Sequence, residues 1–314
     1  MDFIELDTLD ESIISALKVD GRATTKSLGK MFGVAHTTIA SRIQRMRELG
    51  VMHVRAVTDA KAYGFNELAI VGFQVRGSAL ETAQQIPKSY PGVVVYVASG
   101  TLGRFDLIVV LLAKDVATLQ HYVDENISKV SQIVSSEIWL AVDVLKFVTE
   151  WALLNQVGHP LPPNPAIEDE LPLLDLFYED GRTSYSQASR VLGHTEVQIR
   201  NKVNRLVKDK LLHFSAVKDP QTIGPPLMAL IFMKVELKHA KAIAKKLSSM
   251  EEFAFVGRFI GRFEIIGLVT LQDLPALFNL VNNQLRQLKG MIRTESMQIV
   301  ENYHQEPRWV RILS

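Results

Sequence analysis

The sequence predicts an α+β protein with two winged helix-turn-helix domains and two ferredoxin-like βαββαβ domains in tandem. Residues 20–59 return without a gap as residues 180–219, and self-similarity at a fixed offset marks a duplicated unit. Each copy has three short helical patterns with a glycine before the third, which is typical of a helix-turn-helix. Strand and helix patterns then alternate after each copy, and 314 residues are enough for several small domains.

The first two helices of the first copy are bounded by turn residues. Apolar residues at helical spacing predict a helix over 9–17, and Gly21 follows where a helix end favours the left-handed conformation. Thr24 is the expected N-cap of the second helix, and Gly33 makes the turn into the third. Val51–Val57 alternates as a strand or wing.

The third helix of each copy is the expected recognition helix, which enters the major groove of DNA. Arginine, glutamine and hydroxyl side chains on its outward face suit contacts to base edges and phosphates, although a solvated basic face is the alternative. The residues expected inward are Ile39, Ile43, Met46 and Leu49 in the first copy and Ile199, Val203 and Leu206 in the second. The candidate DNA-binding residues are Thr37, Thr38, Ser41, Arg42, Gln44 and Arg45 in the first copy and Arg200, Lys202, Arg205 and Lys208 in the second.

The two recognition helices differ in their N-caps. Thr195 and Gln198 form a capping-box pair, and Ser184 and Gln187 form another on the preceding helix. The first copy has Ala35 at the position of Thr195, which forgoes roughly 1 kcal/mol of capping. We therefore expect the first recognition helix to start one residue later or to fray.

Residues 58–155 alternate between strand and helix after a connector at Thr58–Gly64. Apolar residues of both parities in Leu107–Ala113 indicate a strand buried on both faces, and a second identical sheet is the simplest cover. The expected order is βαββαβ, with four antiparallel strands and two helices on one face. The strands are expected at Leu68–Val75, Val93–Ala98, Phe105–Ala113 and Ile133–Phe147, and the helices at Ala79–Ile86 and Asp115–Ile127.

The second half repeats this order after a proline-rich stretch. Prolines in Gln156–Pro165 indicate a stiff, extended linker. The second set of elements is expected at Leu227–Leu237, Ala240–Met250, Phe253–Ile260, Phe263–Leu271, Leu274–Leu288 and Met291–Asn302. The expected domains are therefore 1–57, 58–155, 168–217 and 218–314, with a linker at 156–167.

Composition narrows the class of protein. The formal net charge is only +1, so any DNA affinity must come from local patches such as Arg42, Arg45 and Arg47. The absence of cysteine excludes disulfides and cysteine-ligated metal centres, and no histidine cluster has ligand spacing, so we expect no metal and no cofactor. The N-terminus lacks the pattern of a signal peptide and the longest apolar run, Leu107–Ala113, is too short to span a bilayer, so we expect a cytoplasmic protein.

The first half contains a series of short motifs, namely Leu6-Asp7-x-x-Asp10, Asp20-Gly21-Arg22-x-Thr24, Gly33, Ile39, Arg42-Ile43, Gly50-Val51, Asp59, Gly64 and Gly103-Arg104-Phe105-Asp106. These motifs resemble those of the Lrp/AsnC (leucine-responsive, feast/famine) transcription regulators. The resemblance implies a winged helix-turn-helix that binds palindromic operators in double-stranded DNA. It also implies a ferredoxin-like domain that dimerises sheet to sheet, assembles into larger homo-oligomers, and often binds an amino acid between dimers. One chain with two copies would form the dimer internally.

The second copy departs from the family pattern. Glu264 replaces the aspartate of the Gly-x-aromatic-Asp turn, Pro225-Pro226 precedes the first strand, and Glu170-Leu171-Pro172 replaces the usual Leu-Asp pair. The two halves need not read the same half-site or share one effector site. The candidate effector-binding residues, which are first of all those of tight turns, are Gly103, Arg104, Asp106, Gly261, Arg262 and Glu264.

The roles of several histidine and aromatic residues have two possible interpretations. His53 and His213 take matching positions in the wings, where they contact phosphate or are exposed without a role. The aromatic side chains of Phe105, Phe255 and Phe263, with that of Tyr90, are expected in the core or an interface rather than stacked on a ligand.

Two other functions stay open. Fused two-copy proteins of this architecture also resemble the sirohaem decarboxylases, which would need histidine and arginine residues converging in the effector-domain cleft. Here His121 and His239 are expected in or at the start of helices instead. A DNA-inactive sensor or co-regulator is the third reading.

Overall fold

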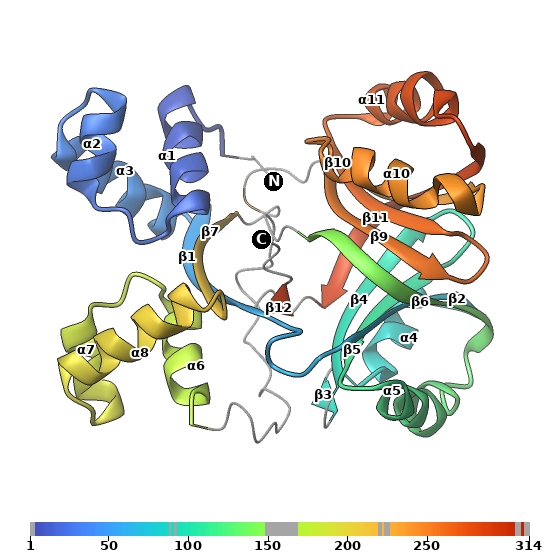
Figure 1. Cartoon of the computed structure of the whole chain (residues 1–314), viewed down its shortest axis with the longest axis horizontal. Coiled ribbons are helices and arrows are strands. Elements are labelled where there is room, and N and C mark those ends of the chain that lie inside the picture. Colours follow the sequence, from blue (N-terminus) through green and yellow to red (C-terminus); the bar gives the residue numbers. More distant parts are fainter. Residues whose placement is uncertain are drawn as a thin grey trace.

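The computed structural model describes residues 4–87, 89–90, 93–147, 169–218, 222, 227–304 and 309–310. These residues form a helical lobe and a sheet lobe, side by side (Figure 1). The expected linker at 156–167 lies outside the described residues.

The helical lobe begins with one three-helix unit. Its elements are α1 (Thr8–Val19), α2 (Thr25–Phe32), α3 (His36–Glu48) and the strand β1 (Met52–Asp59). Thr24 caps α2 by accepting from the Ser27 N–H over 3.0 Å, as expected. Gly33 makes the turn into α3 with φ of 69°. The predicted inward face of α3 is correct for Ile39, Ile43 and Met46, but Leu49 is 44% exposed because α3 ends at Glu48.

A second three-helix unit has the same order of elements. It consists of α6 (Leu171–Glu179), α7 (Tyr185–Leu192), α8 (Glu196–Lys208) and the strand β7 (Leu212–Lys218). The capping box of Thr195 and Gln198 is present, whereas for Ser184 the contacts of the described residues include only the half in which its side chain accepts from the Gln187 N–H.

The expectation that α3 starts late is wrong. It begins at His36, the position in the first copy that matches the start of α8 at Glu196. The extended backbone of Ala35 keeps the N-cap geometry, and its carbonyl oxygen accepts from the Thr38 N–H over 3.0 Å without a side-chain cap.

The two strands expected as wings pair with each other. β1 and β7 are antiparallel, from Met52 opposite Lys218 to Thr58 opposite Leu212, and they lie between the two sets of helices (Figure 1). The prediction of a wing on each unit is therefore corrected to a shared ribbon. The short strand β12 (Trp309–Val310) pairs in parallel with the end of β1 and extends this ribbon to three strands.

Gly21 has a different role from the one expected. It is absent from the residues with positive φ, so it does not end α1 in the left-handed conformation. A Cβ atom on Gly21 would lie 2.7 Å from the carbonyl oxygen of Phe214 in β7. Glycine is required here because α1 approaches the strand of the other unit closely.

The first half of the sheet lobe has the expected βαββαβ order. Its strands run β6-β2-β5-β4, and the additional short strand β3 pairs with β4 at the edge. Its elements are β2 (Glu67–Val75), α4 (Ala79–Gln85), β3 (Ser89–Tyr90), β4 (Val93–Leu102), β5 (Leu107–Ala113), α5 (Val116–Tyr122), a π-helical turn (Val123–Ile127) and β6 (Ile133–Phe147).

The second half has the corresponding strand order, β11-β8-β10-β9. Its elements are β8 (Leu227–Val235), α10 (Leu237–Ser248), β9 (Phe253–Ile260), β10 (Ile265–Leu271), α11 (Leu274–Asn279), a π-helical turn (Leu280–Gln284), a 3-10 turn (Leu285–Gln287) and β11 (Met291–His304). α10 begins at Leu237, ahead of the predicted start at Ala240, with Glu236 as its N-cap.

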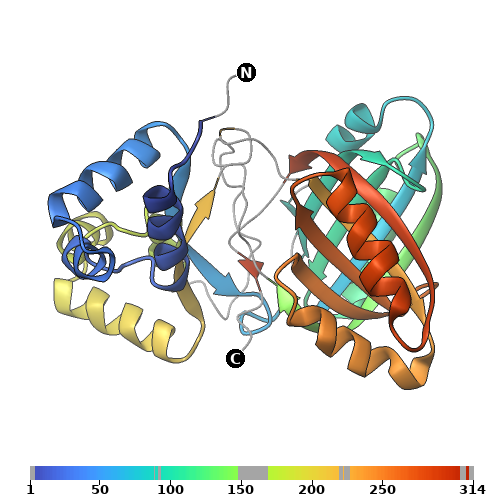
Figure 2. The same ribbon diagram turned by 90° about the horizontal axis from the view of Figure 1, so that it is seen from above.

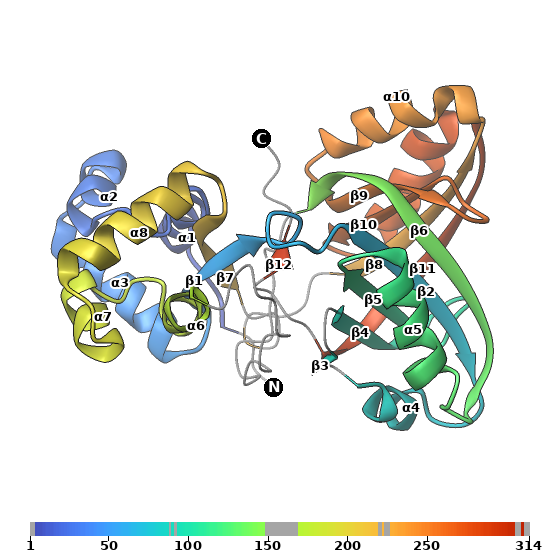
Figure 3. The ribbon, with the colours of Figure 1, turned by 60° about the horizontal axis from the view of Figure 1, so that its bottom comes forward.

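The two four-stranded sheets cover each other, but they are not separate layers. β6 pairs with β9 and β4 pairs with β11, so the strands close on themselves. The helices lie outside this closed sheet, with α4 and α5 on one side and α10 on the other (Figure 3); Figure 2 gives the view from above. Side chains from both halves, including those of Phe105, Trp139, Phe232 and Phe263, fill the interior. The edge pairing was not anticipated from the sequence.

Candidate functional site

The outward face of α3 is polar and exposed. Thr37, Thr38, Ser41 and Gln44 are exposed, whereas Ile39 and Ile43 between them are buried in the core that α3 shares with α1 and α2. The Gln44 amide donates to the Glu48 carboxylate one turn further along, over 2.7 Å. This surface offers hydroxyl and amide groups of the kind that read base edges.

The two arginines of α3 are bound to carboxylates at the start of α1. Arg42 Nη1 lies 2.5 Å from Asp7 Oδ2 and 2.9 Å from Asp10 Oδ1, and Arg45 Nη1 lies 3.3 Å from Asp10 Oδ2. The hydrogen bond from Arg42 lowers the pKa of Asp7, and the same contacts raise the pKa of Arg42. Arg42 is 28% exposed and Asp10 only 1%. Arg42 therefore fixes α3 on α1, while the half-exposed Arg45 can also reach outward.

The basic residues of α8 also have partners within the chain. Arg205 pairs with Glu170 over 2.8 Å, Lys202 donates to the Asp169 carbonyl oxygen over 2.5 Å, and Arg200 pairs with Glu196 one turn earlier. Lys208 is exposed at the end of the helix. Glu170 and Arg205 take the positions of Asp10 and Arg45 in the second copy, so the same kind of ion pair holds α8 on α6.

The connector of the first half reaches the second unit. Tyr63 donates its hydroxyl to Glu170 Oε2 over 3.1 Å, and Glu170 in turn binds Arg205. Burial, followed by the negative charge of Glu170, raises the pKa of the Tyr63 hydroxyl. The segment that leads to the sheet lobe is thereby in contact with the start of α6, at the carboxylate that also binds Arg205 of α8.

Two arginines that sequence reasoning had not assigned to a site join the two units. Arg22 Nη2 donates to the Thr183 carbonyl oxygen over 2.7 Å, and Arg182 donates to the carbonyl oxygens of Gly21 and Ala23 over 2.8 and 3.1 Å. Burial lowers the pKa of both guanidinium groups. The repeated Asp-Gly-Arg motif was the sequence feature that could have pointed to these contacts. The arginine of each motif binds the backbone of the other copy.

The histidines expected in wings lie in the shared ribbon. His213 is half-buried, and its Nε2 lies 3.1 Å from the carbonyl oxygen of Lys18 at the end of α1. His53 is half-buried in β1. Neither is an exposed strand histidine, and His213 contacts the backbone of the other unit.

The candidate effector residues lie in the two turns that precede β5 and β10. Gly103 and Gly261 have φ of 158° and 150°, and a Cβ atom would lie 2.7 Å from Met297 Cγ at Gly103 and 2.5 Å from Trp139 Cδ1 at Gly261. Each turn therefore packs closely against a side chain of the opposite half.

The carboxylates of these turns bind the backbone of their own half. Asp106 accepts from the Val75 N–H and Glu264 from the Val235 N–H, each over 2.9 Å, and Glu264 also pairs with Lys234 over 2.6 Å. Both side chains tie the turn to the end of a neighbouring strand.

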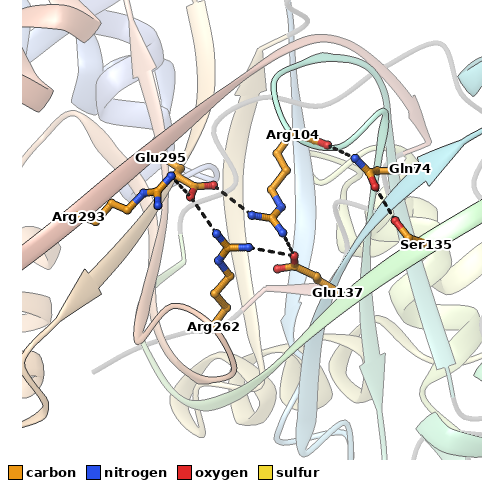
Figure 4. Close-up of polar contacts among 7 residues, drawn as sticks. All are labelled: Gln74, Arg104, Ser135, Glu137, Arg262, Arg293 and Glu295. Carbon is orange, nitrogen blue, oxygen red and sulfur yellow. Dashed lines mark hydrogen bonds and ion pairs between the residues drawn. The ribbon is translucent and has the colours of Figure 1, made fainter.

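The arginines of the turns meet two carboxylates where the halves join (Figure 4). Arg104 pairs with Glu137, and its Nη1 lies 3.9 Å from Glu295. Arg262 lies 3.5 Å from Glu137 and 3.6 Å from Glu295, and Arg293 lies 3.0 Å from Glu295. We call these five residues the arginine–glutamate cluster. Its members Glu137, Glu295 and Arg293 were missed, although Glu137 and Glu295 are separated by the same offset as Arg104 and Arg262.

The described part of the chain has neither a metal-binding cluster nor a membrane-spanning helix. No group of three or more His, Asp or Glu side chains there could hold a metal ion. No helix among the described residues is long and apolar enough to cross a membrane.

Known families and relatives match both kinds of domain. The model of the AsnC-type helix-turn-helix domain matches residues 6–47, and that of the Lrp/AsnC ligand binding domain matches residues 228–309. HTH-type transcriptional regulator FL11 of Pyrococcus furiosus is 32% identical over 148 residues, which cover 46% of this chain and 95% of that protein. Regulatory protein AsnC of Haemophilus influenzae is 25% identical over 138 residues, covering 44% of this chain and 91% of that protein.

A solved structure is similar over nearly the whole length. The siroheme decarboxylase NirDL, in complex with an iron-uroporphyrin III analogue, has a TM-score of 0.62 at 12% identity and covers 94% of this chain and 92% of that chain. At this identity the likeness concerns the fold. The fold and the exposed helices define a helix-turn-helix protein with an attached α+β domain. The chain belongs to the Lrp/AsnC family of transcription regulators.

Proposed function

We propose that this chain is a sequence-specific DNA-binding transcription regulator whose two halves are a tandem duplication. The helix-turn-helix units are residues 1–57 and 168–217, and the ferredoxin-like domains are residues 58–155 and 218–314. The similarity of both kinds of domain to the Lrp/AsnC family supports the function. The shared order of elements and the constant offset between residues 20–59 and 180–219 support the duplication.

One observation carries the proposal. The exposed helices α3 and α8 belong to a single body, because β1 and β7 pair along seven residue positions and Arg22 and Arg182 cross between the units. A dimeric helix-turn-helix protein needs two recognition helices held at a fixed spacing to contact successive major grooves. One chain supplies both.

Binding to DNA can be tested by fluorescence polarisation with fragments from around the protein's own gene, at two salt concentrations. Affinity should fall steeply with salt because phosphate contacts release counterions. Ser41→Glu in α3 and Asn201→Glu in α8 place a carboxylate on each exposed face and should weaken binding by at least about ten-fold. Ser131→Glu, an exposed position in the sheet lobe, is the matched control. Salt-independent binding, or equal binding by all variants, would contradict the proposal.

We propose in addition that the sheet lobe binds a small effector, such as an amino acid, near the turns at Gly103–Asp106 and Gly261–Glu264. The match of residues 228–309 to a ligand-binding domain supports this. The arginine–glutamate cluster supplies groups for both a carboxylate and an ammonium. A thermal-shift screen of amino acids on the parent protein and on Arg262→Gln tests it, and a shift unaltered by the variant would place the ligand elsewhere.

Self-association is part of the proposal. Family resemblance implies assembly of dimer-like units, and each chain would be one such unit. Light scattering at micromolar concentration should give a mass above 35.2 kDa; a strictly monomeric mass would contradict it.

A second function is favoured by one observation, the similarity to the decarboxylase NirDL over 94% of the chain. Against it, His121 lies on α5 and His239 on α10, outside the closed sheet. Absorbance of the purified protein after incubation with a ferric tetrapyrrole separates the two functions. A bound tetrapyrrole spectrum, together with no DNA binding, would favour the enzyme. Neither activity would favour a DNA-inactive sensor.

A further inference from the structure

The two recognition helices are held in the same way. Ile39 and Met46 of α3 are buried, as are Ile199 and Leu206 at the matching positions of α8. The ion pair between Arg45 and Asp10 recurs as that between Arg205 and Glu170. Both helices therefore present the same positions to the outside.

The residues at those outward positions differ. Thr37 corresponds to Val197, Ser41 to Asn201, and Gln44 to Asn204, all at the same offset and all exposed. Two further outward residues of α8 bind other groups of the same helix. Gln198 belongs to the capping box, and Arg200 pairs with Glu196.

The chemistry of the two faces differs accordingly. Val197 is 63% exposed, and an apolar side chain at a helix surface facing DNA matches the methyl group of thymine. Asn201 can pair with adenine through both groups of its amide, whereas Ser41 at the same position of α3 can bind any base edge. The two faces therefore present different groups to the bases at matching positions, and the face of α8 suits a thymine and a nearby adenine.

Each chain has one outward face of α3 and one outward face of α8. The N–H of Gly21 donates to Phe214 and that of Gly181 to Val54, so each unit is attached to the strand of the other within the chain. A homodimer presents two identical helices and reads a palindrome, because its two-fold symmetry is mirrored by the operator. A chain with two unlike helices has no such constraint.

We infer that the DNA contacted by one chain of this protein is not a palindrome but a pair of unlike half-sites in a fixed order. The half-site contacted by α8 contains a thymine and an adenine read by Val197 and Asn201. The inference rests on the proposed DNA-binding function and names the class of DNA that this function takes.

Selection from a random DNA pool with the full chain gives the two half-sites, A for α3 and B for α8. Polarisation then compares probes AB, AA and BB of equal spacing. The parent should bind AB at least about ten-fold more tightly than AA or BB, because each wrong base contact carries a substantial loss. Equal binding of AB and AA, or selection of two neighbouring half-sites that are identical, overturns the inference. No salt-sensitive binding of any selected DNA overturns the proposed function itself.

Face exchange provides the second arm. The triple variant Val197→Thr/Asn201→Ser/Asn204→Gln gives α8 the residues of α3 at these three outward positions and should shift preference from AB to AA. The reciprocal variant Thr37→Val/Ser41→Asn/Gln44→Asn should shift it to BB. These side chains are exposed, so folding is retained; Asn201→Ala alone, which should lose discrimination at the adenine of B only, checks the assignment with a smaller change. Preference for AB in both exchanged variants contradicts the inference.

Discussion

The backbone N–H of Gly21, just after α1, donates to the carbonyl oxygen of Phe214 in β7 over 2.9 Å. The corresponding bond in the other direction joins the Gly181 N–H to the Val54 carbonyl oxygen over 2.8 Å. Each three-helix unit thus rests on the strand of the other unit. The helical lobe is expected to fold as one cooperative body, because neither unit completes its core alone.

Gly21→Ala is expected to lower the free energy of unfolding by about 3 kcal/mol. The added Cβ would lie 2.7 Å from the backbone of Phe214, which cannot move without breaking the β1–β7 pairing. Gly33→Ala is the control, since it has open space around it and a left-handed backbone alone, for a loss of about 1 kcal/mol. Urea unfolding monitored by circular dichroism measures both. Equal losses of unfolding free energy for the two variants would show that the backbone accommodates the added Cβ atom at Gly21 with little strain.

Lys210→Gly should stabilise the protein by about 1 kcal/mol. Lys210 has φ of 57°, which is unfavourable for a residue with a Cβ atom, whereas Gly50 takes the matching position after α3 with φ of 67°. The gain should appear as a higher urea midpoint with an unchanged slope. Gly50→Ala is the reciprocal change and should cost a similar amount; a neutral result in both would indicate that the backbone relaxes.

The local elements were largely predictable because periodicity is a property of neighbouring residues. Ile133–Phe147 and Phe253–Ile260 are strands with the predicted bounds. The pairing of β1 with β7 and of β6 with β9 was not predictable, since a strand pattern does not name its partner. Thr58 and Asp59, expected in the connector, extend β1 for the same reason.

The binding partners of the candidate site residues were likewise not predictable from the sequence. An outward helical position identifies Arg42 as exposed or partnered, but the carboxylates of Asp7 and Asp10 that bind it come from another helix. Arg104 and Arg262 were named from a turn motif, yet their meeting at Glu137 depends on how the two halves join. Residue type can thus be read from sequence, whereas its partner cannot.

Arg22→Ala should destabilise the helical lobe by about 2–4 kcal/mol. Arg22 donates to the Thr183 carbonyl oxygen, and its guanidinium lies 4.5 Å from the Tyr185 ring centroid and 4.8 Å from that of Phe214. The variant loses a charge-assisted hydrogen bond and the packing of the side chain. Arg190→Ala, at an exposed position of α7, should change stability by less than about 0.5 kcal/mol. Thermal unfolding with both variants checks the difference, and similar midpoints would contradict it.

The contact between Asp7 and Arg42 makes the start of α1 sensitive to acid. The pKa of Asp7 is lowered in the folded state, chiefly by the hydrogen bond from Arg42. The ionised Asp7 carboxylate therefore stabilises the folded protein fully above its unfolded pKa of about 4. This stabilisation is lost as pH falls through the lower, folded pKa. NMR titration of the Asp7 carboxyl should give a pKa below its ordinary value, which returns toward that value in Arg42→Ala. A pKa that is the same in both proteins would mean that the pair does not form in solution.

Asp10→Asn is expected to separate the two roles of the arginines on α3. Asp10 is 1% exposed and binds both Arg42 and Arg45, so neutralising it should cost about 2–4 kcal/mol of stability. Arg42 keeps Asp7 as a partner, whereas Arg45, which is 51% exposed, loses its carboxylate and becomes available to phosphate.

The slope of log affinity against log salt for DNA should therefore steepen by about one counterion in Asp10→Asn. Glu5→Gln removes a charge from the same end of the chain at an exposed position and controls for the change in net charge. If both variants steepen the slope equally, the effect is one of overall charge. If the slope of Asp10→Asn alone steepens, and Arg45→Ala in the same background restores it, then Asp10 sets how many cations α3 presents to the DNA.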